Sequence, residues 1–296
     1  MKHFAQKLTD FWASKMRKTQ SLLETIMRTK AILFHTAIAA GLLISTSAAA
    51  QAAQPQEMSS PWSFSASIGT DIAVGGEVMN AGNSNALNLA TLNSNLSGTG
   101  VLMMRGRDYK DMYEPGAKAA VEVRYAISEL SEYFGSVSYM RAAGKNNIDV
   151  GCIASVALAC NTRLLGSVSD LQETAVELGY RHWLGTGFIS EAIRPYFAIR
   201  GGAAWSKGGH NYLHTATDSL AMWRLYDDSV VYAAQFDIGA TYTISRNAEL
   251  AAEIGVRYSS DRDGLDTDYG AIGLAAINNN SSRVSIPMSV KLNAVF

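Results

Sequence analysis

The chain has 296 residues, of which 48% are hydrophobic and 17% are charged, and its formal net charge is −1. Residues 1–52 hold seven Lys/Arg and two Asp/Glu, which leaves 18 basic and 24 acidic residues in the rest of the chain. Nucleic-acid binding needs concentrated Lys/Arg to neutralise phosphates, so this acidic balance excludes that class of partner.

The N-terminal segment has the three parts of a secretory signal peptide. Basic residues precede an apolar run, residues 31–45, and the small residues after it include an A-x-A cleavage site at residues 50–52. The apolar run is too short for a membrane-spanning helix. The stretch before Met27 is long for a signal peptide, so the sequence leaves open whether Met27 is the true start or the leader is extended.

We therefore expect a leader over residues 1–52 and one mature domain over residues 53–296, because no Pro- or Ser-rich linker divides the remainder. Alternating apolar and polar residues dominate this domain, and such a period of two predicts strands with one apolar face and one polar face. Eight segments show it: 62–74, 117–125, 133–141, 172–184, 193–205, 230–244, 248–258 and 283–296.

The last segment is the most regular of the eight. From Arg283 to Phe296 only Val295 interrupts the polar row, and Phe296 falls in phase with the apolar row. The segment is longer than an ordinary strand of roughly 5–6 residues but suits a tilted strand that crosses a bilayer. This strand predicts a transmembrane β-barrel, with an amphipathic edge strand of a soluble sandwich as the alternative.

The connections between the eight segments alternate in length. The short ones are 126–132, 185–192 and 245–247, and the long ones are 75–116, 142–171, 206–229 and 259–282. Outer-membrane barrels have short periplasmic turns and long extracellular loops, and in lipid only helices and closed barrels satisfy every backbone polar group. The sequence therefore predicts an all-β fold: a transmembrane, antiparallel, up-and-down barrel of eight strands in the bacterial outer membrane.

Aromatic residues near the strand ends support this fold, because amphipathic rings favour the headgroup level of a bilayer. The set comprises Trp62, Tyr125, Tyr133, Trp183, Trp205, Tyr232, Tyr242, Tyr258 and Phe296.

The polar faces of the strands are rich in charge of both signs. The inward set comprises Asp71, Lys118, Glu122, Arg124, Glu173, Glu177, Arg181, Arg194, Arg200, Asp237, Glu249, Glu253, Arg257, Arg283 and Lys291. An eight-stranded barrel is only just wide enough for its side chains, so these groups are expected to pair across the lumen. Such pairs contribute little net stability because desolvation offsets the Coulomb gain. They favour a salt-bridge-plugged lumen over a porin-like channel.

Short motifs in these strands resemble pieces of small outer-membrane barrels, namely residues 177–181 (ELGYR), 193–196 (IRPY) and 283–287 (RVSIP). With the topology, they make the chain similar to the eight-stranded OmpA transmembrane-domain and OmpX-like superfamily. The resemblance implies a surface antigen with a role in adhesion, host contact or envelope integrity. It also implies that the terminal aromatic, Phe296, is read by the barrel-assembly machinery, and that OmpA's periplasmic peptidoglycan-binding domain is absent.

The loops offer weak signals for chemistry. Cys152 and Cys160 are close in an exported chain, which predicts a disulfide. His210 and His214 have a metal spacing only on a helix, and the Asn-rich first loop reads as a flexible polar surface. The acidic fourth loop offers weak calcium candidates, although its spacing does not match an EF-hand. These candidates are Asp261, Asp263, Asp266 and Asp268.

His182 follows an arginine, as in lipid A deacylase barrels, but no serine follows it to serve as the nucleophile. We therefore predict a non-enzymatic monomer without cofactor or catalytic residues. Its expected partners are outer-membrane lipid, lipopolysaccharide, the barrel-assembly machinery and extracellular ligands of the loops. Two alternatives remain. A low-conductance pore is favoured if lumen charges leave a wet path, and a lipid-acting enzyme is favoured if the third-loop histidines converge on a serine.

Overall fold

The computed structural model describes residues 61–155, 160–185, 192–245, 247–263, 270–278 and 281–295. The predicted leader and Phe296 lie outside these residues. Among the residues described, no helix is long and apolar enough to cross a membrane.

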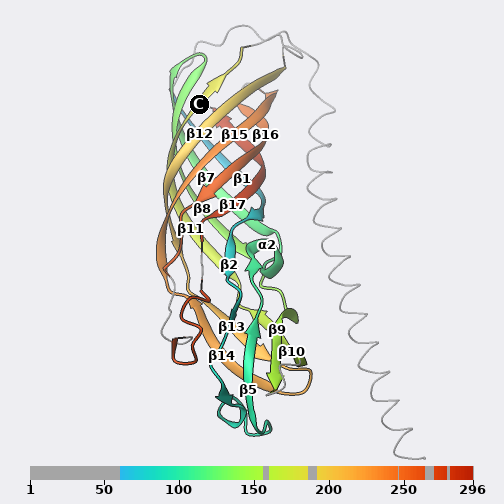
Figure 1. Ribbon diagram of the computed structural model, residues 1–296. Coiled ribbons are helices and arrows are strands. Elements are labelled where there is room, and N and C mark those ends of the chain that lie inside the picture. Colours follow the sequence, from blue (N-terminus) through green and yellow to red (C-terminus); the bar gives the residue numbers. More distant parts are fainter. Residues whose placement is uncertain are drawn as a thin grey trace, which may run out of the picture. The chain divides into compact units, whose positions relative to one another are not determined.

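Eight long strands form a closed barrel (Figure 1). They are β1 (Trp62–Gly75), β7 (Gly116–Ser128), β8 (Ser131–Ala142), β11 (Leu171–Trp183), β12 (Ile193–Ser206), β15 (Ser229–Ser245), β16 (Ala248–Ser259) and β17 (Arg283–Val295). Each pairs antiparallel with its neighbour in this series, and β1 closes on β17 with Ile68 opposite Val290. The predicted fold class is confirmed, with all eight strands in the expected segments.

Alternation along each strand places apolar side chains outside the barrel and charged side chains inside it. In β11, Leu178 is 72% exposed on the outside, whereas its neighbour Glu177 is 1% exposed on the inside. Val176 and Ile199 also lie on the outside. A fold with apolar groups outside and charged groups inside is the reverse of a water-soluble fold. This arrangement is typical of a barrel embedded in hydrocarbon.

The strands extend further into one predicted turn than the sequence indicated. Residues 126–132 were expected to connect two strands, but β7 runs to Ser128 and β8 begins at Ser131. The β7–β8 ladder includes a pair between Ala126 and Glu132 and then shifts register, so a bulge continues the pairing almost to the turn. The extension places Glu132 inside the barrel, where it is buried.

The long connections are not simple loops. They fold into a second sheet, here called the distal sheet, whose strands are β3 (Gly82–Asn83), β4 (Leu87–Asn88), β5 (Thr99–Met104), β9 (Ile148–Ser155), β10 (Cys160–Val168), β13 (Gly209–His214) and β14 (Ser219–Tyr226). The strand order is β14-β13-β10-β9-β5-β3, with β4 also paired to β5 (Figure 1). Contributions from three different connections therefore make one sheet.

Short elements complete the first connection. They are β2 (Glu77–Met79), which pairs with β6 (Arg107–Asp108), the 3₁₀ helix η1 (Leu89–Thr91) and the helical turn α2 (Tyr109–Met112).

The first connection, predicted to be a flexible polar surface, contains asparagines that form specific hydrogen bonds. The side chain of Asn88 accepts from the backbone N–H of Ala90 and caps η1. Asn95 donates to Asp218 Oδ1 at 2.9 Å, and Asn93 donates to the carbonyl of Ser219 at 2.6 Å. Asparagine is typical of loops because it bonds nearby backbone, and here the same property ties two connections together.

Two hydrophobic clusters lie beyond the barrel wall. One underlies the distal sheet and comprises Met79, Leu102, Met104, Val150, Ile153, Leu164, Leu213, Leu220, Leu274 and Ile277. The second packs the first connection against the loop ends of the barrel strands and comprises Val78, Tyr109, Met112, Tyr113, Met140, Ala142, Val168, Leu171, Leu225 and Tyr226. The first cluster gives the sheet its own core, and the second fastens it to the barrel mouth.

Candidate functional sites in the lumen and the distal sheet

The middle of the lumen holds five charged side chains in mutual contact. Lys291 Nζ lies 3.1 Å from Glu122 and 2.8 Å from Glu253. Arg181 lies 2.9 Å from Glu122 and 3.3 Å from Glu253, and Arg200 lies 3.2 Å from Glu253. Three cations thus enclose two carboxylates from β7 and β16.

The loop end of the lumen is closed by a second group. Glu173 accepts from Arg283 at 2.9 Å and also from Arg262, which belongs to the fourth connection. Arg262 further donates to the hydroxyl of Tyr109 at 2.6 Å and to Ser206 Oγ at 3.0 Å. Arg262 was not among the predicted lumen residues, because it lies beyond the alternating segment, where sequence gives no inward direction.

The periplasmic end has a third group that also contains a missed residue. Glu132 accepts from Arg181 and lies 3.7 Å from Arg124. Trp183, which was expected in the lipid-facing aromatic belt, is instead buried inside the barrel with the guanidinium of Arg194 at 4.6 Å from its ring. That expectation is wrong because successive strand residues point to opposite faces. Trp183 therefore shares the inward face of Arg181, two residues before it.

The structure pairs most, but not all, of the predicted inward set. Those with an ion pair are Asp71, Glu122, Arg124, Glu173, Glu177, Arg181, Arg200, Asp237, Glu253, Arg257, Arg283 and Lys291. Within the described residues, Lys118, Arg194 and Glu249 have no ion pair, although Glu249 accepts from Asn293 at 3.3 Å and Arg194 donates to the carbonyl of Glu129 at 3.0 Å.

A cavity of about 20 Å³ lies in the lumen beside Lys118 and Arg200. This volume accommodates about one water molecule. Asp237 and Glu253 also line this cavity, so charges of both signs surround it.

The predicted disulfide is present. Cys152 in β9 and Cys160 in β10 are bonded, with their Cα atoms 5.6 Å apart. Of the calcium candidates, Asp261 and Asp263 follow β16, whereas Asp266 and Asp268 lie outside the described residues. In the part of the chain that is described, no group of three His, Cys, Asp or Glu is placed to hold a metal ion.

The third-connection histidines lie on strand β13, so their spacing does not bring them together as a helix would. His214 Nε2 is 3.5 Å from Ser167 Oγ, and its Nδ1 is 3.0 Å from the carbonyl of Thr215. His210 instead uses its backbone N–H to bind Ser169 Oγ at 2.9 Å. The two histidines do not converge on one serine.

A serine that sequence spacing missed lies beside His182. Ser131 on the neighbouring strand β8 is directly opposite His182, and its Oγ is 3.0 Å from Nδ1. The Tyr180 hydroxyl lies 2.9 Å from the same Oγ and 3.3 Å from the same Nδ1. The serine and tyrosine hydroxyls both contact the same ring nitrogen of His182, so the three residues satisfy one another's hydrogen bonds within the aromatic belt. Among the described contacts, no carboxylate orients the imidazole, as a catalytic base needs.

The distal sheet buries one face and exposes part of the other. Met103 and Arg163 both lie opposite Cys152 and so share its face, on which Cys152 is buried and the Arg163 side chain is exposed. Tyr212 and Met222, which face each other across β13 and β14, are 45% and 59% exposed on it. These two residues add apolar surface to the accessible part of this face.

A cluster of arginines lies at the β5–β9–β10 side of the distal sheet. Arg105 and Arg163 share the carboxylate of Asp149, at 3.0 Å and 3.1 Å, and their side chains are 57% and 66% exposed. Arg107 donates to the backbone carbonyl of Asp149. Three guanidinium groups around one carboxylate leave this patch, here called the arginine patch, with net positive charge.

A closed eight-stranded barrel with an apolar exterior and a charged interior defines the class: the protein has the fold of a small outer-membrane β-barrel. No family model matches the chain, and no curated protein matches it. Among solved structures it is similar to Neisserial surface protein A, with 12% identity, a TM-score of 0.35 and coverage of 80% of this chain and 98% of that one.

Two other similar structures belong to proteins with different activities. The attachment invasion locus protein Ail of Yersinia pestis, solved with the heparin analogue sucrose octasulfate, is 11% identical, covering 78% of this chain and 98% of its own, with a TM-score of 0.33. The outer-membrane protease OmpT of Escherichia coli is 8% identical, covering 83% and 99%, with a TM-score of 0.38. The similar structures thus include an attachment protein and a protease.

Proposed function

We propose that the protein is a closed, non-enzymatic scaffold that holds the distal sheet at the cell surface for interaction with external ligands. The single observation that carries this proposal is that the long connections form a sheet with its own hydrophobic core and a disulfide, while part of the opposite face is left exposed. A rigid surface loses little conformational entropy on binding, which is the advantage of a pre-organised site.

The arginine patch supports an anionic ligand. Arg105 and Arg163 are pinned by the same carboxylate, so their guanidinium groups are pre-oriented and retain free donors for a second anion. The rest of the protein is acidic, so an anionic ligand is attracted only to the arginine patch. A polymer that contacts the patch along a short stretch therefore fits better than a polyanion that covers the whole surface. We propose an anionic polysaccharide as the ligand class.

The test compares dextran sulfate with neutral dextran on immobilised protein. The double variant Arg105→Gln/Arg163→Gln is expected to lose dextran sulfate binding, because both exposed cations of the patch are removed. Arg141→Gln serves as the matched control, since Arg141 is also an exposed arginine paired with an aspartate, at 2.7 Å from Asp170, but lies at the end of β8. Equal losses in both variants, or binding unaffected by salt, would contradict the arginine patch.

The pore alternative is tested by single-channel conductance in planar bilayers. Because the lumen is filled with paired charges, we expect no single-channel current. Heat-dependent gel mobility confirms that the protein tested is folded. Steady discrete openings would contradict the closed scaffold and favour a small diffusion pore. Conductance and polysaccharide binding are separate measurements, so failure of one proposal leaves the other testable.

A further inference from the structure

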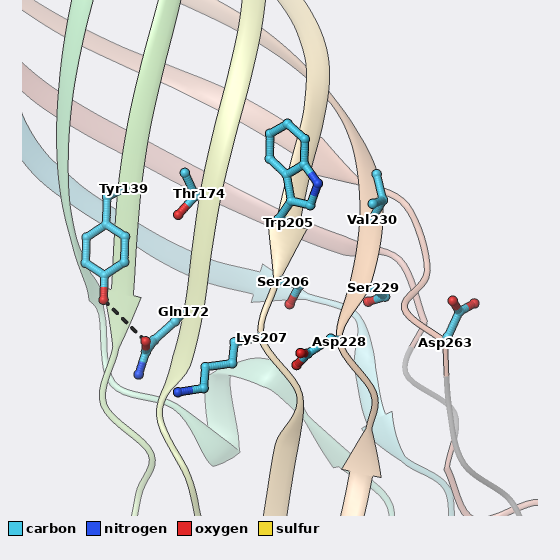
Figure 2. Close-up of a pocket in the computed structure, with 10 residues that line it drawn as sticks. All are labelled: Tyr139, Gln172, Thr174, Trp205, Ser206, Lys207, Asp228, Ser229, Val230 and Asp263. Carbon is cyan, nitrogen blue, oxygen red and sulfur yellow. Dashed lines mark hydrogen bonds between the residues drawn. The ribbon is translucent and has the colours of Figure 1, made fainter.

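A cavity of about 700 Å³ lies on the outer side of the barrel wall at its loop end. Its barrel-side wall is formed by Thr174, Trp205 and Val230, from three adjacent strands, β11, β12 and β15 (Figure 2). Trp205 and Val230 are 53% and 50% exposed and directly opposite each other in the β12–β15 ladder. This wall continues the lipid-facing surface, so hydrocarbon of the outer leaflet reaches it. The volume is that of a small-molecule site.

The loop-side wall of the same cavity is polar. Lys207, Asp228 and Asp263 line it, beyond the row of Thr174 and Trp205 (Figure 2). Lys207 forms no ion pair within the described residues, and both carboxylates contribute to the lining. Two carboxylates and one ammonium give a wall that accepts hydrogen bonds from hydroxyl groups and carries no excess of positive charge.

Two further contacts show that the polar wall is built rather than incidental. Asp228 Oδ1 accepts from the backbone N–H of Gly208 at 2.6 Å, and the backbone carbonyl of Asp263 accepts from the N–H of Asp227 at 3.1 Å.

We propose that this cavity binds an acylated glycolipid of the outer leaflet. The acyl chain lies along Val230 and the lipid-facing wall, a sugar ring packs on the face of Trp205, and sugar hydroxyls donate to Asp228 and Asp263. The assignment follows from the order of the walls: hydrocarbon contact on the barrel side, an aromatic ring at the headgroup level, and acceptors beyond it. A lipid whose head is a bare phosphate is disfavoured, because two carboxylates face it and only Lys207 attracts it. This inference requires the barrel in its membrane and does not depend on the distal sheet binding a ligand.

The test measures which lipid stays bound when the barrel leaves its membrane. Protein purified from outer membranes is placed in phosphatidylcholine nanodiscs that contain equal, small mole fractions of a diglucosyl diacylglycerol and of phosphatidylglycerol, and retained lipid is identified by native mass spectrometry. We expect one diglucosyl lipid on the wild type, and about a tenfold lower retention in Trp205→Ala or Asp263→Asn, as for the loss of one good contact.

The matched control is Trp62→Ala, which removes a tryptophan of similar exposure, 50% against 53% for Trp205, from the opposite end of the barrel. It is expected to retain the diglucosyl lipid fully. Retention of phosphatidylglycerol instead, equal retention in Trp205→Ala and wild type, or no retained lipid would each overturn the proposal. Heat-dependent gel mobility checks that every variant is folded, and the exposed Asp263→Asn carries the test if Trp205→Ala does not fold.

Discussion

The guanidinium of Arg262 and the hydroxyl of Tyr109 are joined by a hydrogen bond of 2.6 Å, although 153 positions separate them. Tyr109 is in the first long connection and Arg262 in the fourth, and the same guanidinium binds Glu173 inside the barrel mouth. The contact therefore joins two connections to each other and to the lumen. Residues outside the barrel strands therefore contribute to the packing at the mouth of the lumen.

Arg262→Ala should strongly destabilise the protein. Its removal leaves the buried carboxylate of Glu173 with Arg283 as its one remaining cation among the described residues, and the loss of a hydrogen bond to a charged group costs about 1.5–3 kcal/mol. The free energy of unfolding is measured by urea titration in micelles. Arg141→Ala should cost far less, because the Arg141–Asp170 pair is exposed to solvent. Equal losses in the two variants would contradict the role of Arg262 as the seal of the lumen.

Ile254→Arg should destabilise the barrel in a depth-dependent way. Ile254 lies on the lipid-facing side near the middle of β16, so an arginine there should cost about 2–4 kcal/mol. Tyr258→Arg lies on the same face at the loop end of the same strand, where the charge costs about 0–1 kcal/mol. Refolding into vesicles under urea measures both. A larger loss at Tyr258 would contradict the assigned position of the barrel in the membrane.

Replacing both cysteines by serine should loosen the distal sheet and spare the barrel. The disulfide closes a loop with a sequence separation of 8, which corresponds to about 2–3 kcal/mol of chain entropy. Hydrogen exchange should then accelerate in β9 and β10, while protection in β16 and β17 is unchanged. Uniform acceleration in all strands would mean that the sheet and the barrel unfold as one unit.

The tyrosines beneath the distal sheet predict an alkaline transition. Burial raises the pKa of Tyr226 to about 12, partly opposed by the positive charge of Arg262, and burial also raises the pKa of Tyr113, whose hydroxyl lies 3.0 Å away. A pKa raised above the unfolded value of about 10 means that this stability is complete below pH 10 and is lost as pH rises through about 12. Absorbance of tyrosinate, followed with hydrogen exchange in β14, measures it. Tyr226→Phe should lessen the transition, and an unchanged profile would contradict this origin.

The barrel could be read from the sequence because its information is local. In a strand each residue's face is set by its neighbours, so alternation around Glu177 and Glu253 predicts an inward charge without knowing its partner. The short connections then identify the periplasmic ends of the strands, and the long connections identify the external ends. The same local rule, applied to Trp183, would have placed its ring inside the barrel.

The partners were decided only by the tertiary structure. Arg262, Ser131 and the strands of the distal sheet meet residues from distant connections, and nothing periodic in their own segments points toward those contacts. Pairing of β5 with β9 and of β10 with β13 depends on loop ends that the closed barrel brings together. The sequence by itself therefore determined a membrane barrel with a charged interior. The seal of its mouth, the ordered sheet above it and the lipid-side cavity exist because closure places distant segments within contact distance.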